Sequence, residues 1–275
     1  MQIQSLGSQT DLIFSRFSGE VIDKGDYTVI RTPSNPTFWY GNYVVFPNPP
    51  EAQDITRWME ISAREFPDAK HRVFGFDGVN GEIGAAKDFE ALGFDVIKTI
   101  VMTASEVHAP PKVNLEAEYR QILTAEDWKQ TIQLRIECND EHEPEGYKVF
   151  IHRKMLEYQR MTEAGLGFWW GAFLNAEMVS SLGLFVEHGV GRFQSVETHP
   201  EYQRRGICGT LVHTAATHGL ETLNARVLVM CADPEYHAAR IYESVGFKPT
   251  ERQIALERAP QEDQEFRNAK AELTP

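Results

Sequence analysis

One stretch of the sequence, residues 195–223, combines the end of a strand, a glycine-containing turn and a helical pattern. The preceding residues 190–198 are apolar and β-branched enough for a strand, and His199 and Pro200 end it. After the turn, apolar and small residues recur at helical spacing, at Leu211, Val212, Ala215, Ala216, Gly219, Leu220 and Leu223. The sequence therefore predicts a strand, a tight turn and a helix with one buried face.

The turn has small residues at the point where the helix is expected to begin. Gly206 and Gly209 lack a Cβ and Cys208 is small, so a phosphate group can approach the backbone closely. The first N–H groups of a helix have no intrahelical partner, and together with the helix dipole they bind anions. Arg204 and Arg205 add positive charge. A diphosphate-binding turn is one interpretation, and a turn with solvated arginines is the other, because short glycine patterns are common.

Two other phosphate-binding patterns, GxxxxGK followed by Ser or Thr and GxGxxG, are not found at this turn. Residues 203–208, QRRGIC, instead resemble the acyl-CoA loop of the GCN5-related N-acetyltransferases (GNAT). That loop reads Gln or Arg, two residues, Gly, one residue, then Gly or Ala, and here Cys208 takes the last position. Residues 225–249, ARVLVMCADPEYHAARIYESVGFKP, look like the next strand, helix and closing turn of the same family. The resemblance covers roughly residues 114–258.

The resemblance implies transfer of an acetyl or other acyl group from acetyl-CoA (coenzyme A) to a primary amine, by direct attack without an acyl-enzyme. It places the pantetheine arm against the strand backbone and the diphosphate on the turn. The implied cofactor-binding residues are Val196, Thr198, Gln203, Arg204, Arg205, Gly206, Ile207, Cys208, Gly209, Thr210 and His237. His237 stands where the family often has an asparagine.

Two residues are candidates for catalysis. Glu197, at the strand end beside the expected thioester, can serve as the general base, directly or through water, or is a surface glutamate. His199 is the alternative base. By resemblance, Tyr242 occupies the position of a tyrosine that lies near the sulfur, where its hydroxyl protonates the leaving thiolate or its ring simply packs. Residues 124–139 begin with Thr124 as an expected N-cap and Asp127 three residues later, close to a capping box, and residues 167–174 and 178–188 alternate as the strands of a hairpin. In the family, the helix before this hairpin helps to form the acceptor site, so Tyr158, Trp169 and Trp170 either line that site or belong to the core.

The first 111 residues contain a similar order of strand and helix patterns. The segment DFEALGFDVIKTIVM near Phe94 is similar to IYESVGFKPTERQIAL near Phe247, which suggests an internal repeat. In place of the basic turn, the first copy has Pro47, Pro49 and Pro50, which carry no backbone N–H. The first unit is therefore interpreted as a degenerate GNAT-like copy without a cofactor loop, or as an unrelated supporting α/β domain.

These patterns predict an α/β (α+β) fold with a GNAT-like mixed, largely antiparallel twisted sheet flanked by helices. The expected organisation is a supporting unit at residues 1–111, an acetyltransferase domain at 112–258 and a charged tail at 259–275. Pro110 and Pro111 mark the connector between the two units.

Composition restricts the partners. A net charge of -13 argues against affinity for nucleic acid or an anionic membrane. Three cysteines are too few for a disulfide framework, and the histidines and cysteines lack metal-ligand spacing, so no metal is expected. We expect a cytoplasmic monomer or homodimer that acts on a small-molecule or peptide amine. A non-catalytic acyl-CoA-binding sensor or scaffold is the alternative function.

Overall fold

The computed structural model describes residues 3–140, 142–235 and 238–273. Its contacts divide the chain into two compact units that are not continuous in sequence. Unit 1 contains Met1–Ile100, Glu141–Gly146 and Glu251–Pro275, and unit 2 contains Val101–Asp140 and Tyr147–Thr250. This grouping differs from the division at residues 111 and 258, which stays a prediction about domains.

Unit 1 begins with a helix that the sequence analysis did not identify, α1 (Leu6–Ser18). Its sheet has the order β1-β2-β3-β4-β11. The elements of this unit, with the two long strands β5 and β11 that also contribute residues to unit 2, are α1, β1 (Glu20–Asp23), β2 (Thr28–Arg31), η1 (Trp39–Gly41), β3 (Tyr43–Phe46), α2 (Asp54–Glu65), β4 (Arg72–Phe76), η2 (Ala86–Leu92), β5 (Asp95–Ala104), β11 (Lys248–Arg258) and α7 (Gln261–Leu273).

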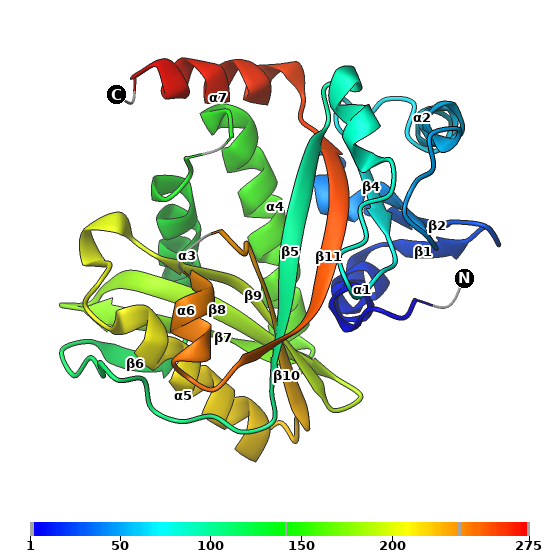
Figure 1. Ribbon diagram of the computed structural model, residues 1–275. Helices are drawn as coiled ribbons and strands as arrows, with labels where there is room; N and C mark the ends of the chain where they lie inside the picture. Colours follow the sequence, from blue (N-terminus) through cyan, green and yellow to red (C-terminus); the bar gives the residue numbers. More distant parts are fainter. Residues whose placement is uncertain (1–2, 141, 236–237, 274–275) are drawn as a thin grey trace. The chain divides into compact units, whose positions relative to one another are not determined.

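Unit 2 contains the strand, turn and helix from which the sequence analysis started (Figure 1). Its strands follow the order β5-β10-β9-β8-β7-β6, and neighbours from β6 to β9 are antiparallel. Its further elements are β6 (Glu118–Gln121), α3 (Ala125–Glu137), α4 (Pro144–Glu163), β7 (Gly167–Leu174), β8 (Glu177–Glu187), β9 (Val190–Thr198), η3 (Pro200–Tyr202), α5 (Ile207–Glu221), β10 (Val227–Ala232) and α6 (Ala238–Glu243). The predicted mixed, largely antiparallel sheet flanked by helices is confirmed.

Each unit contains a pair of parallel strands joined through a helix. In unit 1, β3 and β4 are parallel and α2 connects them, whereas in unit 2, β9 and β10 are parallel and α5 connects them. The strand after each parallel pair has residues in both units. β11 follows β10 in the chain and pairs with β4 in unit 1, whereas β5 follows β4 in the chain and is the neighbour of β10 in unit 2. The same order of elements occurs twice, as the sequence similarity indicated.

The start of α3 shows the local chemistry that the sequence predicted. Thr124 Oγ1 accepts a hydrogen bond from the Asp127 N–H at 3.1 Å, and Asp127 Oδ2 accepts one from the Thr124 N–H at 3.1 Å. This reciprocal capping box satisfies two amides that the helix itself cannot pair. The strand that the pattern of residues 38–46 predicts is shorter, because residues 39–41 form a 3-10 turn before β3. The helix expected over residues 85–94 and ending at a glycine is found as a 3-10 helix, followed by Gly93.

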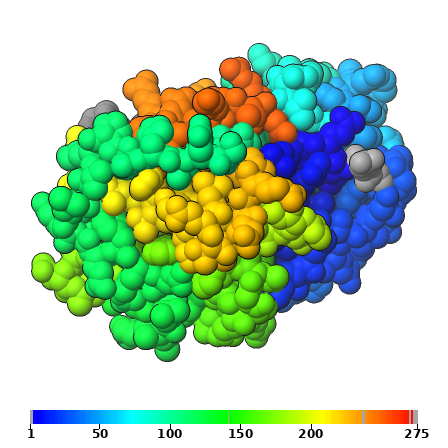
Figure 2. Space-filling model, turned by 90° about the horizontal axis from the view of Figure 1, so that it is seen from below, coloured from blue at the N-terminus to red at the C-terminus, as the bar shows by residue number. Residues whose placement is uncertain are grey.

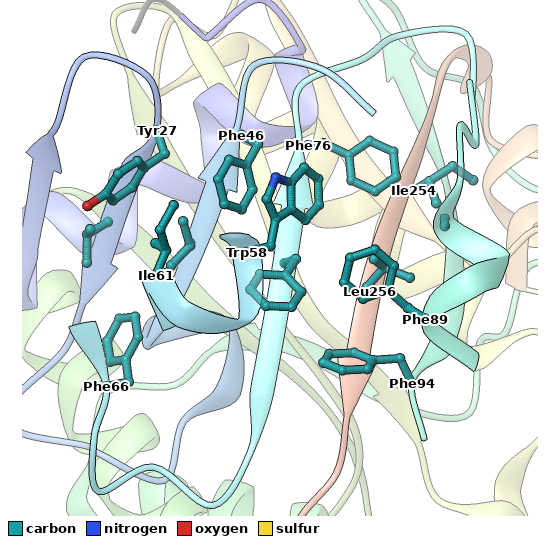
Figure 3. Close-up of a cluster of buried hydrophobic side chains, with 14 residues drawn as sticks. Tyr27, Phe46, Trp58, Ile61, Phe66, Phe76, Phe89, Phe94, Ile254 and Leu256 are labelled. Atoms are coloured by element: carbon teal, nitrogen blue, oxygen red, sulfur yellow. The ribbon is translucent and has the colours of Figure 1, made fainter. Parts of the chain in front are cut away.

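Aromatic side chains fill the core of unit 1, and Trp58 of α2 lies at the centre of them (Figure 3). Its ring stacks on Phe46 with a centroid distance of 3.8 Å and an interplanar angle of 6°. Phe74, Phe76 and Phe89 surround the same indole at 5.6 to 6.2 Å. Only 2% of Trp58 is exposed, so α2 is held on the sheet mainly by apolar burial.

Replacing this indole should therefore destabilise unit 1. We expect Trp58→Ala to lower the free energy of unfolding by about 3–5 kcal/mol, through lost burial and the cavity left behind. Urea denaturation followed by circular dichroism measures the change. Leu123→Ala is the control, because Leu123 is 78% exposed and its truncation should change stability by less than about 0.5 kcal/mol. Equal effects of the two variants would contradict this account of the core.

Candidate active site

The loop between β9 and α5 adopts a conformation that gathers backbone N–H groups. Arg204 and Gly206 both have left-handed backbone, with φ of 60° and 80°, and α5 begins directly after Gly206. The N–H of Thr210 donates to the Gly206 carbonyl at 3.1 Å, which is the first bond of the helix. Within the described chain, no acceptor is found for the N–H groups of residues 204–209. Left-handed residues at a helix start form a concave cluster of donors suited to an anion.

A segment of unit 2 that the sequence analysis treated only as a connector supports this loop. Lys112 Nζ donates to the Arg204 carbonyl at 2.7 Å, and Asn114 Nδ2 donates to the Arg205 carbonyl at 3.2 Å. The Asn114 N–H also donates to Thr210 Oγ1 at 2.9 Å. In Figure 2 the green residues of this segment border the yellow residues of the loop and α5. The segment therefore binds the loop through its carbonyls and leaves its N–H groups free.

Glycine is required at position 206 for a second reason besides its backbone angle. A Cβ at Gly206 would lie 2.4 Å from the Lys112 carbonyl oxygen, a backbone atom that cannot rotate away. A substitution there would displace the supporting segment together with the loop. Gly206→Glu, which from sequence alone is the obvious change to block the site, therefore disturbs the loop itself and is not a clean test of binding.

The two arginines of the loop differ in their surroundings. Arg205 forms an ion pair with Glu116 and lies over the Tyr202 ring, 5.6 Å from its centroid. Arg204 is exposed. Arg204 is therefore the more available cation for an incoming phosphate, whereas Arg205 also helps to hold the loop.

Strand β9 separates from β10 just before this loop. The parallel pairing of the two strands ends at Arg192 and Val229, while β9 continues to Thr198 along β8. Between these points the β8–β9 register is irregular, and Ser195 has a φ of 50°. Such a bulge bends a strand and redirects its backbone groups. The bulge lies next to Val196, one of the two positions predicted to contact the pantetheine arm.

Two predicted cofactor-binding side chains are engaged with each other at the end of β9. Gln203 Nε2 donates to the Thr198 carbonyl at 3.3 Å, and Thr198 Oγ1 lies 2.8 Å from Ser180 Oγ. Ile207, Gly209 and Thr210 are buried where α5 begins. Their roles in binding stay predictions.

Glu197 lies on the side of β9 where it meets a residue that the sequence analysis did not identify. Its Oε2 accepts a hydrogen bond from Arg135 Nη1 of α3 at 2.5 Å, and both side chains are 19% exposed. Burial raises the pKa of the Glu197 carboxyl, and the Arg135 guanidinium opposes that rise. Glu197 is therefore a partly buried, paired carboxylate and not a solvated surface residue. The 62 residues between the partners explain why no local pattern indicated the pair.

The other catalytic candidates are placed differently. Tyr242 of α6 is 5% exposed and its ring lies 6.5 Å from that of Phe247. His199 caps η3, with its Nδ1 accepting from the Glu201 N–H at 3.3 Å. His237 lies outside the described residues. Neither role of Tyr242, proton donor or packing residue, is decided by these contacts.

The aromatic residues considered for the acceptor site lie in the core of unit 2. Tyr158 and Trp169 are 3% and 1% exposed and their rings are 4.9 Å apart, and Trp170 is 9% exposed with its ring 5.4 Å from His218. Burial of this extent matches the packing alternative for these three residues.

The corresponding turn of unit 1 has fewer backbone N–H groups, because of its prolines, and no basic side chain. Residues 47–50 contain three prolines, and Asp54 in the first turn of α2 accepts a hydrogen bond from the Glu51 N–H at 2.9 Å. The Ala85 N–H donates to the Pro50 carbonyl at 2.7 Å. A carboxylate therefore stands where unit 2 has free amides and an arginine, so this turn is unsuited to a phosphate.

Metal and membrane binding find little support in the described part of the chain. No group of three or more histidine, cysteine or acidic side chains that could hold a metal ion occurs there. No helix within the described ranges has the length and apolar character needed to span a bilayer. The expectations of no metal and of a cytoplasmic location stay predictions.

Comparison with known proteins finds a family profile that matches part of the second half of the chain. The profile of the "Acetyltransferase (GNAT) family" matches residues 128–247. No curated protein sequence matches the chain.

Solved structures extend the similarity to nearly the whole chain. A GCN5-related N-acetyltransferase from Kribbella flavida has 12% identity and a TM-score of 0.64, over 93% of this chain and 96% of that one. Another from Sphaerobacter thermophilus has 14% identity and a TM-score of 0.60, over 86% and 82%. A tandem GNAT protein from the clavulanic acid biosynthesis pathway, solved without acetyl-CoA, has 13% identity and a TM-score of 0.53, over 90% and 86%. The predicted resemblance is confirmed, and the N-terminal half is also GNAT-like in fold.

The thiols of Cys208 and Cys138 should react slowly with alkylating agents, because their surroundings raise their pKa values. Burial raises the pKa of the Cys208 thiol to about 11, although a hydrogen bond with Thr198 lowers it. Burial also raises the pKa of the Cys138 thiol to about 12, and the Glu197 carboxylate adds to the rise. Because the thiolate is the reactive form, we expect iodoacetamide at pH 8 to label Cys208 on the order of 100-fold, and Cys138 on the order of 1000-fold, more slowly than in unfolded protein.

Peptide mass spectrometry after timed labelling measures both rates, and the protein in guanidinium provides the reference. Fast labelling of Cys208 in the folded protein would show an ionised thiol and would reopen a nucleophilic role for that residue.

Proposed function

We propose that this protein, whose residues 128–247 form a GNAT domain, transfers an acyl group, in the first place acetyl, from acetyl-CoA to a primary amine. The observation that carries the proposal is the set of unpaired N–H groups at residues 204–209, beside an exposed arginine. A diphosphate has the charge and the acceptor atoms that such a cluster requires.

The residues of β9 would position the reacting groups. Beyond Arg192 the strand has no ladder with β10 in the described part of the chain, so the backbone near Val196 and Thr198 can bond an extended amide-containing arm. Bound acetyl-CoA would supply an activated thioester carbonyl. Holding that carbonyl beside the amine removes much of the entropic barrier to attack.

Glu197 would then take the proton from the attacking amine. As the new C–N bond forms and the C–S bond breaks, the nitrogen loses a proton to the carboxylate, directly or through water, and the departing sulfur gains one. Tyr242 is the candidate donor to the sulfur. A partly buried carboxylate with a raised pKa is a stronger base than a solvated one, which suits this role.

The acceptor is proposed to be a small-molecule or peptide amine, and the protein a monomer or homodimer. The competing function is an acyl-CoA-binding sensor or scaffold. The ion pair between Glu197 and Arg135 favours it, since a carboxylate occupied by an arginine is less available as a base. Unit 1, whose corresponding turn has fewer backbone N–H groups, would support unit 2 in either case.

Charge reversal at Arg204 tests the binding site without changing a glycine. We expect Arg204→Glu to weaken acetyl-CoA binding roughly ten- to hundredfold, because a favourable contact with phosphate becomes a repulsion. Isothermal titration calorimetry measures the affinity. Arg153→Glu on α4 is the matched control, since Arg153 is also exposed and the net charge changes equally. Equal affinities of both variants would argue against a diphosphate at this loop.

Catalysis is tested by measuring free thiol with acetyl-CoA and a panel of amines and amino acids. We expect thiol release that depends on the amine, and a loss of about 10²- to 10⁴-fold in kcat for Glu197→Gln, as expected for removal of a general base. Binding of acetyl-CoA with no amine-dependent release would support the sensor. A Glu197→Gln variant with the rate of the unmodified protein would exclude Glu197 as the base.

A further inference from the structure

The ion pair between Arg135 and Glu197 is largely buried. In unit 2 the guanidinium Nη1 lies 2.5 Å from the carboxylate Oε2, and only 19% of each side chain is exposed. Arg135 Nε is also buried and has no hydrogen-bond partner among the described residues. Loss of either partner of a buried ion pair leaves an uncompensated charge.

The carboxylate has one nearby positive charge among otherwise neutral or negative groups. Ser181 of β8 is directly opposite Glu197 in the strand register, and its Oγ is buried without a partner in the described chain. Other titratable groups interact with this ion pair. Cys138 and Asp140 follow α3, and Tyr147 and Tyr158 belong to α4.

Both burial and Asp140 favour the neutral form of Glu197, and Arg135 alone among these groups favours the charged form. A general base must be ionised before it can accept a proton. In this environment, the availability of the base therefore depends on Arg135.

We propose that Arg135 is a positioning residue for acyl transfer, which keeps the Glu197 carboxylate ionised and fixes its orientation at the end of β9. The inference rests on the proposed function, in which Glu197 accepts the proton of the amine. Arg135 itself touches no reacting atom in this scheme. In this scheme the ion pair with Arg135 prepares Glu197 for catalysis and does not argue for a sensor.

The experiment measures the protonation of Glu197 directly and its effect on rate in parallel. The side-chain carboxyl ¹³C resonance of Glu197, assigned by its disappearance in Glu197→Gln, is titrated in the unmodified protein, Arg135→Met, Arg135→Lys and the control Lys129→Met. Lys129 is on the same helix with its side chain 78% exposed. The pH dependence of kcat/KM is recorded for the same proteins with one amine, so that the ionisation of the acceptor is common to all.

We expect Arg135→Met to raise the apparent pKa of Glu197 by about one to three pH units, the usual effect of removing a close opposite charge. The acid limb of kcat/KM should move upward by the same amount, because a base with a higher pKa loses its proton only at higher pH. Much of the rate should return above that limb. Arg135→Lys, which keeps the charge, should shift both quantities less, and Lys129→Met should shift neither.

An unchanged Glu197 pKa in Arg135→Met overturns the inference, as does a shifted pKa with an unmoved acid limb. Two other results would contradict the proposed function itself. Either the unmodified protein would release no thiol with any amine, or Glu197→Gln would keep its full rate. Amide NMR spectra show whether each variant is folded, and Arg135→Gln replaces Arg135→Met should the latter not fold.

Discussion

The candidate site depends on one steric constraint, the contact between Gly206 and the carbonyl of Lys112. Because a Cβ would lie 2.4 Å from that oxygen, only glycine lets the segment before β6 lie against the loop. The segment in turn occupies the carbonyls of Arg204 and Arg205 and leaves their N–H groups unpaired. Side chains of this segment thus satisfy carbonyl acceptors of the loop, while its N–H donors have no partner among the described residues.

The two parallel strand pairs give both units a place for such a site, and the residues of the turn distinguish the units. In both units a helix connects two parallel strands, so the helix N-terminus lies at the carboxyl end of the first strand. In unit 2 this N-terminus has glycine and arginine, whereas in unit 1 it has prolines and the Asp54 carboxylate. The fold supplies the position, and the turn residues decide whether an anion can bind there.

The sequence predicted those features that are encoded within a few residues. The helix α5, the capping box of Thr124 and Asp127 and the strands of the β7–β8 hairpin depend on local periodicity and turn chemistry, and all were found. The pairing of β4 with β11 and the ion pair of Arg135 with Glu197 join residues far apart in the chain. No spacing rule contains such contacts, so the sequence could suggest Glu197 as a base but not Arg135 as its partner.

The ion pair between Arg135 and Glu197 decides how the site is interpreted. A carboxylate buried without a partner would bind its proton near neutral pH, and one exposed to water would be a weak base. Glu197 lies between these limits because burial raises its pKa while Arg135 restrains the rise. A base for an amine has to be ionised in the resting protein and still accept a proton during attack, and a partly buried pair satisfies both conditions. The geometry of this pair is therefore compatible with the role proposed for Glu197 as the base in acyl transfer.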